Sequence, residues 1–123
     1  VSDLYVNNEK PQVLPSASLK EVIMEISKKR LGTTAVIDEN KQLLGIITDG
    51  DLRRMLEKNI PLNSVTAKEI MTVGPKTVPA DALAVEALDR MRQYDITQLV
   101  VVNSESTYVG IIHLHDLIRE GLI

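Results

Sequence analysis

Two stretches of the chain place side chains able to bind an anion at matching positions. Gly45 begins the segment Gly-Ile-Ile-Thr-Asp-Gly-Asp-Leu-Arg-Arg, and Gly110, 65 residues later, begins Gly-Ile-Ile-His-Leu-His-Asp-Leu-Ile-Arg. Each stretch is typical of an apolar strand that turns directly into a helix. The first turn of such a helix presents free backbone N–H groups and the positive end of the helix dipole, which suit an anion. The pair predicts two related sites, or one site and its relic.

Thr48 and Asp51 carry the chemistry of the first stretch. The Thr hydroxyl and the first helical N–H groups can hold a phosphate, while the Asp carboxylate can accept from a pair of sugar hydroxyls. The same Thr-x-x-Asp spacing also forms a capping box, which needs no ligand. Gly50 leaves the turn open to close approach. Arg53 and Arg54 lie where the dipole disfavours cations, so we expect either an anion nearby or pairing with the turn's own carboxylates.

His113 stands in the second stretch where the first has Thr. A neutral imidazole can donate to a phosphate, and an imidazolium does so better. His115 and Asp116 follow, so the segment also allows a metal site, or simply a partly buried polar turn. We expect no metal there, because a helix should begin within this segment and the chain holds no further His.

Composition narrows the class of protein. The chain has 123 residues, of which 44% are hydrophobic, and a net charge of −3. These values are typical of a small globular domain and argue against a nucleic-acid-binding face. Because the sequence lacks Cys and any apolar run of about 18 residues, we expect a cytoplasmic protein without a membrane segment. It shows no nucleophile–base pattern, P-loop or dinucleotide motif, so we expect no catalytic residues and no required cofactor.

The two stretches belong to a repeat of about 60 residues. A shift of 65 aligns 11–58 with the later part of the chain without a gap, and the apolar pattern matches throughout. The pattern predicts β-α-β-β-α in each copy, hence an α/β (α+β) fold with repeats 1–62 and 63–123. Because a unit of this size is marginal alone, we expect the repeats to pack with pseudo-twofold symmetry.

Periodicity predicts the elements that position the two stretches. In the first repeat they are a brief strand over 12–14, a helix from 19 to the basic run 28–30, strands over 34–38 and 43–48, and a helix over 49–58. In the second they are a brief strand over 77–78, a helix that Asp81 caps and that presents Ala84, Ala87, Leu88 and Met91, strands over 98–102 and 108–113, and a helix over 114–121.

The doubled pattern resembles a tandem pair of cystathionine-β-synthase (CBS) domains. Both copies show Gly-apolar-apolar-(Thr/His)-x-x-Asp entering a helix, and the strands 34–38 and 99–103 fit, as does Ile70-Met71-Thr72. More narrowly, Leu31-Gly32-x-Thr34, the run 48–54 and His113-x-His115-Asp116-Leu117 resemble the C-terminal module of SIS-type arabinose-5-phosphate isomerases of the KpsF and GutQ kind.

The resemblance implies a regulatory and oligomerising module rather than the enzyme itself. The SIS domain, which would interconvert arabinose 5-phosphate and ribulose 5-phosphate, would lie N-terminal to Val1, where this chain begins without Met. The module would form a homodimer within a homo-oligomer. The alternative is a purely structural dimerisation module that binds no ligand.

The resemblance also implies a ligand. CBS pairs bind adenine or other nucleotides in two clefts, with phosphate and ribose at the helix-entry turns and the base near 34 and 98. The His in the second turn favours a different phosphorylated ligand, for which CMP-Kdo is a candidate. The residues carried over by position are Thr34, Thr48, Asp51, Arg54, Gln98, His113, His115 and Asp116.

Overall fold

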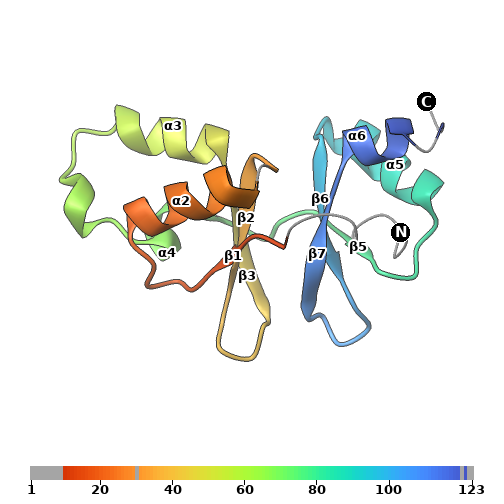
Figure 1. Cartoon of the computed structure of the whole chain (residues 1–123), viewed down its shortest axis with the longest axis horizontal. Helices are drawn as coiled ribbons and strands as arrows, with labels where there is room; N and C mark the ends of the chain where they lie inside the picture. The colour runs from red at the N-terminus through yellow and green to blue at the C-terminus, as the bar shows by residue number, and fades with distance from the viewer. Residues whose placement is uncertain (1–9, 30, 120, 122–123) are drawn as a thin grey trace. The chain divides into compact units, whose positions relative to one another are not determined.

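The computed structural model describes residues 10–29, 31–119 and 121. They form two compact units, one of Pro11–Pro75 and one that runs from Lys76 onwards and includes Lys10. In the first unit α2 and α3 lie on one face of the sheet, and in the second α5 and α6 do the same (Figure 1). The α+β class predicted from the sequence is confirmed.

The sheet of the first unit has four strands among the described residues, in the order β1-β2-β3-β4. β1 (Gln12–Val13) runs parallel to β2 (Thr33–Ile37), and β3 (Leu43–Thr48) is antiparallel to both β2 and β4 (Thr72–Val73). The β2–β3 pair is the predicted hairpin. β4 was not predicted, and it brings a segment near the start of the second repeat onto the first sheet.

The helices of the first unit follow the predicted apolar spacing. α2 (Leu19–Lys29) and α3 (Asp49–Glu57) are the two predicted helices, while η1 (Leu62–Ser64, a 3₁₀ turn) and α4 (Ala67–Ile70) are short additional elements. Ser18 accepts from the backbone of the first turn of α2. The buried side chains of these elements form one core with the strands: Ala17, Leu19, Val22, Ile26, Val36, Ile47, Met55, Val65, Ala67 and Ile70.

The second unit repeats the plan. β5 (Thr77–Pro79) runs parallel to β6 (Gln98–Val102), which pairs antiparallel with β7 (Tyr108–His113); α5 (Ala84–Tyr94) and α6 (Leu114–Arg119) complete it. The helical face predicted for α5 is confirmed, because three of its four members, Ala87, Leu88 and Met91, are buried. The core of the unit is Val78, Ala82, Ala87, Leu88, Met91, Leu99, Val101, Ile112 and Leu117.

Some expectations differ from the structure. Asp81 does not cap α5: the helix begins three residues later, at Ala84, with Leu83 at its N-cap and no side-chain bond there. The repeat boundary at 62/63 stays a prediction. The compact units are a different division of the chain, which falls between Pro75 and Lys76. Arg30 of the predicted basic run lies outside the described residues, as does the segment 1–5, which the sequence indicates only as a short apolar–polar lead-in.

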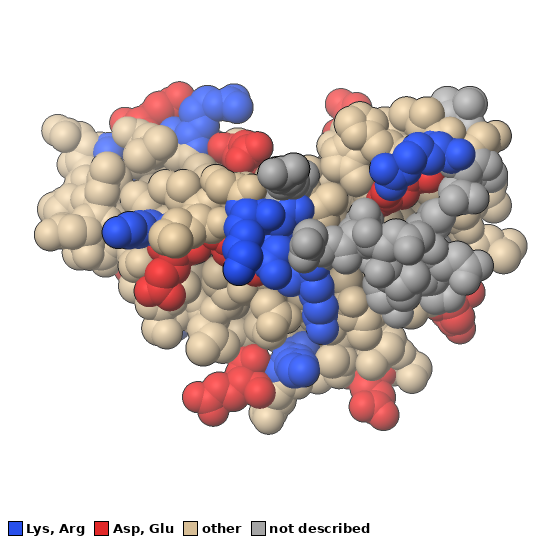
Figure 2. Space-filling view, in the orientation of Figure 1, with Lys and Arg blue, Asp and Glu red and all other residues tan. Residues whose placement is uncertain are grey.

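The surface carries both signs of charge on the face drawn in Figure 2. In the described part of the chain, no helix has the length and hydropathy needed to cross a membrane.

Candidate ligand-binding turns

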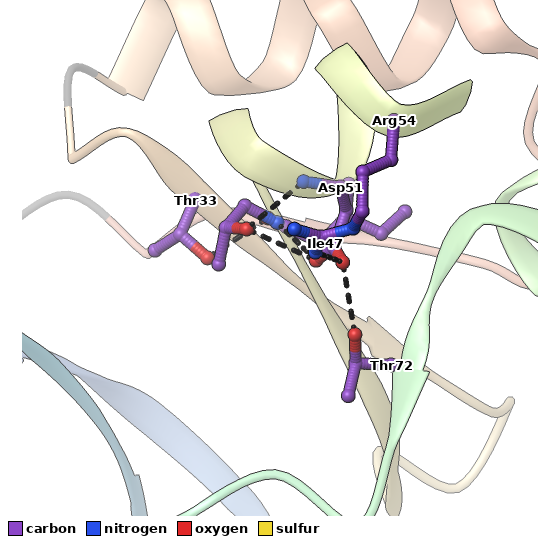
Figure 3. A network of polar contacts seen from close by, with 6 residues as sticks. Thr33, Ile47, Asp51, Arg54 and Thr72 are labelled. Carbon is purple, nitrogen blue, oxygen red and sulfur yellow. Dashed lines mark hydrogen bonds and ion pairs between the residues drawn. The ribbon is translucent and has the colours of Figure 1, made fainter. Parts of the chain in front are cut away.

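The first helix-entry turn is a complete capping box. Thr48 is the N-cap of α3, with extended backbone angles. Its Oγ1 accepts from the Asp51 N–H at 3.2 Å, and its own N–H donates to Oδ2 of Asp51 at 2.8 Å. The Thr48 hydroxyl also donates to that oxygen, at 3.0 Å. The predicted pairing of these two side chains is thus present, and it closes the turn without a ligand (Figure 3).

The other carboxylate oxygen of Asp51 has partners outside the capping box. Oδ1 accepts from Arg54 Nη2 at 2.6 Å and from the Thr72 hydroxyl of β4 at 2.9 Å. The Asp51 side chain is only 6% exposed. Burial by itself raises the pKa of this carboxyl, but hydrogen bonds from Thr48, Arg54 and Thr72 outweigh it and hold the pKa below its ordinary value. Asp51 is therefore a buried anion at ordinary pH.

A glycine in β3 makes the Thr72 contact possible. Gly45 pairs with Val73, and its neighbour Ile46 pairs with Thr72. A Cβ on Gly45 would lie 2.7 Å from Sδ of Met71 and 2.8 Å from the carbonyl oxygen of Thr72. Only a residue without a side chain lets β4 approach this closely. The Gly that opens the sequence motif thus positions a donor to Asp51.

The backbone of the first turn is open to an approaching group. A Cβ at Gly50 would meet Thr48 Oγ1 and Arg54 Nη1 at 3.5 Å each, which is ordinary contact distance. Arg53 is exposed and has no ion-pair partner among the described residues, whereas Arg54 pairs with Asp51. Of the two explanations for the arginines, internal pairing holds for Arg54, and Arg53 is left available to an anion.

The neighbouring strand β2 supports the turn through contacts with the end of β3. Thr33 lies opposite Thr48 in the ladder, and its hydroxyl donates to the Ile47 carbonyl at 2.8 Å. Thr34, the residue predicted to line a base, is fully buried, and its hydroxyl donates to the Ala35 carbonyl at 3.2 Å. Thr34 is thus outside the polar network of the turn, and its contact with a ligand stays a prediction.

The second turn has the same geometry with a different capping side chain. The His113 N–H donates to Oδ2 of Asp116 at 2.7 Å, as Thr48 does to Asp51. Nδ1 of His113 accepts from the His115 N–H at 3.0 Å, so the imidazole caps the start of α6 through the second residue along the chain, whereas the Thr48 hydroxyl caps α3 through the third. Arg119 pairs with the buried Asp116. Gln98 lies opposite His113 in the ladder, in the place that Thr33 has in the first unit.

His113 is held in its neutral form. Burial lowers the pKa of its imidazole, and the neighbouring side chains of His115 and Arg119 lower it further, against the opposing effect of Asp116. Because Nδ1 accepts a backbone bond, the proton of the neutral ring lies on Nε2. The His113 and His115 rings lie 4.3 Å apart between centroids. Among the described residues, no group of three or more His, Cys, Asp or Glu side chains is arranged to hold a metal ion.

The structure thus brings the predicted residues together in two sets, each within its own unit. Thr48, Asp51 and Arg54 form one set, and His113, His115 and Asp116 form the other, with Gln98 across the ladder. Sequence reasoning missed Thr72 and Thr33. The 65-residue offset maps Gln98 onto Thr33, which was the available signal; Thr72 was noted only within the Ile-Met-Thr pattern.

The fold and these doubled turns are those of a known domain class. The CBS domain family model matches the chain twice, over residues 1–58 and 67–122. The chain therefore belongs to the CBS domain family, as a tandem pair.

The relatives narrow the family further. The chain is 46% identical over 120 residues, 98% of its length, to arabinose 5-phosphate isomerase KdsD from Pseudomonas aeruginosa, and 40% identical over its whole length to KdsD from Yersinia pestis. It spans only 37% and 38% of those two relatives, and it is homologous to their C-terminal region.

A solved structure shares the fold closely. It is a CBS domain protein from Pyrobaculum aerophilum complexed with AMP, with a TM-score of 0.83 and 25% identity. The match covers 94% of this chain and 88% of the other.

Proposed function

We propose that this CBS pair is a regulatory module that binds a nucleotide at its helix-entry turns. The observation that carries the proposal is the first turn, where a buried, ionised Asp51 lies at an open helix start, and where Arg53 is exposed and has no ion-pair partner among the described residues. The N–H groups and Arg53 suit a phosphate, and the carboxylate suits sugar hydroxyls. The likeness to a CBS protein complexed with AMP supports an adenine nucleotide as the first ligand to test.

The parent protein is inferred from the KdsD relatives. We propose that the module is the C-terminal part of an arabinose-5-phosphate isomerase, whose catalytic SIS domain precedes it, and that the nucleotide regulates this enzyme in the cytoplasm. CMP-Kdo remains a second ligand to test, because His113 replaces the hydroxyl of the first turn. Neutral His113 still offers Nε2–H as a donor, so the second turn can bind an oxygen of a phosphate or a sugar.

Thermal unfolding of the chain against AMP, ATP, CMP, CMP-Kdo, arabinose 5-phosphate and zinc tests the proposal. A ligand at about 100 times its Kd stabilises by roughly 2.7 kcal/mol, which raises the Tm of a domain of this size by several degrees. We expect a shift with a nucleotide and none with zinc. The absence of any nucleotide shift, supported by calorimetry at millimolar ligand, would contradict the proposal.

Uncovered apolar surface supports a second function, oligomerisation. A groove of about 750 Å³ runs between β1 and α2, and Leu14 and Met24 on its wall are 45% and 60% exposed. A second hollow of about 490 Å³ adjoins it around Ile23 and Leu62, which are also exposed. We propose that α2 forms the contact between two copies of the module.

Sedimentation across a concentration series tests this second function. We expect Met24→Glu to shift the chain towards monomer, because it places a charge in the contact. Leu83→Glu is the matched control, since Leu83 is 71% exposed on the second unit and lies outside both hollows. A chain that stays monomeric at high concentration, or equal dissociation by both variants, would contradict the assignment to α2.

A further inference from the structure

The Asp51 carboxylate has no acceptor site left for a ligand. An ionised carboxylate offers about four lone-pair sites. Four donors from the described residues fill them: the N–H and hydroxyl of Thr48 on Oδ2, and Arg54 with the Thr72 hydroxyl on Oδ1. A sugar hydroxyl that donates to Asp51 must therefore replace a donor already present.

The four donors differ in how easily they are replaced. The Thr48 N–H belongs to the backbone of the capping box, and Arg54 is a charged partner at 2.6 Å, so both are costly to remove. The other two are neutral hydroxyls, one on each carboxylate oxygen. The Thr48 hydroxyl can turn towards a phosphate at the helix start, which frees a site on Oδ2. Freeing a site on Oδ1 requires the hydrogen bond from the Thr72 hydroxyl to break.

Thr72 is well placed to be released. It lies in β4, a two-residue edge strand whose residues are both exposed, so water can satisfy its hydroxyl after release. It is also the one described donor to Asp51 from outside the α3 turn, 21 residues along the chain. The close approach that Gly45 allows keeps Thr72 within reach while the site is empty.

We propose that Thr72 and a ligand diol compete for the Asp51 carboxylate, so that ligand binding at this turn releases β4. The proposal rests on the proposed nucleotide function and adds to it a residue that opposes binding. It follows that a ligand with two neighbouring hydroxyls must displace Thr72, whereas a ligand with one hydroxyl can use the site that Thr48 vacates. Binding of a ligand at the turn thereby loosens the segment 71–75, which contains β4.

Calorimetry of AMP and 2′-deoxy-AMP with the full 123-residue chain tests the competition. We expect Thr72→Val, which removes the hydroxyl at nearly constant shape, to bind AMP about fivefold more tightly, with a smaller gain for 2′-deoxy-AMP. Thr72→Ser keeps the hydroxyl and should bind like the parent chain. Thr66→Val is the matched control, because the Thr66 hydroxyl donates to a different carboxylate, Glu69, at 3.2 Å.

A ligand-free measurement completes the test. In a carbon-detected NMR titration, Thr72→Val should raise the pKa of the Asp51 carboxyl, and Thr72→Ser should restore it, since the hydroxyl bond stabilises the anion. An unchanged pKa, or AMP affinity that is unchanged or weaker in Thr72→Val, would overturn the competition while AMP binding itself stands. No binding by the parent chain or any variant would overturn the nucleotide function and the competition together.

Discussion

The Thr72 hydroxyl lies 2.9 Å from Oδ1 of Asp51, although 21 residues separate the two along the chain. The contact joins a strand near the start of the second repeat to the helix-entry turn of the first. It depends on Gly45, because any side chain there would collide with the backbone of Thr72. The first turn is thus assembled from two segments that are distant in the sequence, and its chemistry cannot be attributed to the Thr-x-x-Asp motif alone.

The Asp51→Asn variant should lose both stability and nucleotide binding. Asn keeps the shape of the side chain but provides one acceptor oxygen for four donors, and it leaves Arg54 without its anion. We expect the free energy of unfolding to fall by about 1–3 kcal/mol at pH 7, measured with urea. Asp89→Asn, an exposed carboxylate on α5, is the control and should change little.

The same variant should also respond less to acid. The folded pKa of Asp51 lies below its unfolded value, so its contribution to stability is present above the unfolded pKa, near 3.9, and is lost as pH falls through the folded pKa. Between pH 5 and pH 2 the loss of stability should therefore be shallower in Asp51→Asn. Parallel profiles for the variant and the parent chain would contradict the assignment of a depressed pKa to Asp51.

His113 should give the second unit a separate pH dependence. Its folded pKa is below the unfolded value of about 6.5, so the unfolded chain takes up the proton first and stability falls as pH drops from about 6.5 through the folded pKa. Protonation also removes the Nδ1 acceptor that caps α6. His113→Thr, the residue of the first turn, should flatten the unfolding profile in this window. An equal slope in both chains would show that another group titrates there.

Much of the fold was predictable from the sequence because each hairpin shows two apolar strands joined by a polar turn. The strands 43–48, 98–102 and 108–113 were predicted with the bounds that the structure has. β2 was placed one residue late. All five of its residues are buried, so the strand shows no apolar–polar alternation from which to fix its start. Thr34 was taken from the family resemblance, whereas the structure places Thr33 opposite Thr48 in the ladder.

The candidate site was predictable only as far as local contacts reach. The capping box and the Arg54 pair join residues three apart, and one turn of helix dictates them. The Thr72 contact depends on β4, whose two residues are too few to show a period. Asp81 was a plausible cap by type, but the helix begins at Ala84, beyond its reach. Contacts between distant segments need the fold itself.

Gly45→Ala should disconnect β4 from the first turn. The added methyl group would lie 2.7 Å from Met71 Sδ and 2.8 Å from the Thr72 carbonyl, and the carbonyl belongs to backbone that pairs with β3. We expect a loss of about 1–3 kcal/mol in urea unfolding. Hydrogen exchange at 71–75 should become faster. Unchanged exchange there would mean that β4 accommodates the methyl group by other movements.

The Gly50→Ala variant should weaken ligand binding without lowering the stability of the chain. A Cβ at this position meets its nearest neighbours at 3.5 Å, and the residue lies inside α3, so Ala should leave stability unchanged or raise it by about 0.5 kcal/mol. The methyl group would nevertheless cover part of the helix start, where a phosphate would lie against the backbone N–H groups. We therefore expect weaker AMP binding by calorimetry with no loss of Tm. Full AMP affinity in a stable Gly50→Ala chain would place the phosphate elsewhere and leave the turn with its capping role alone.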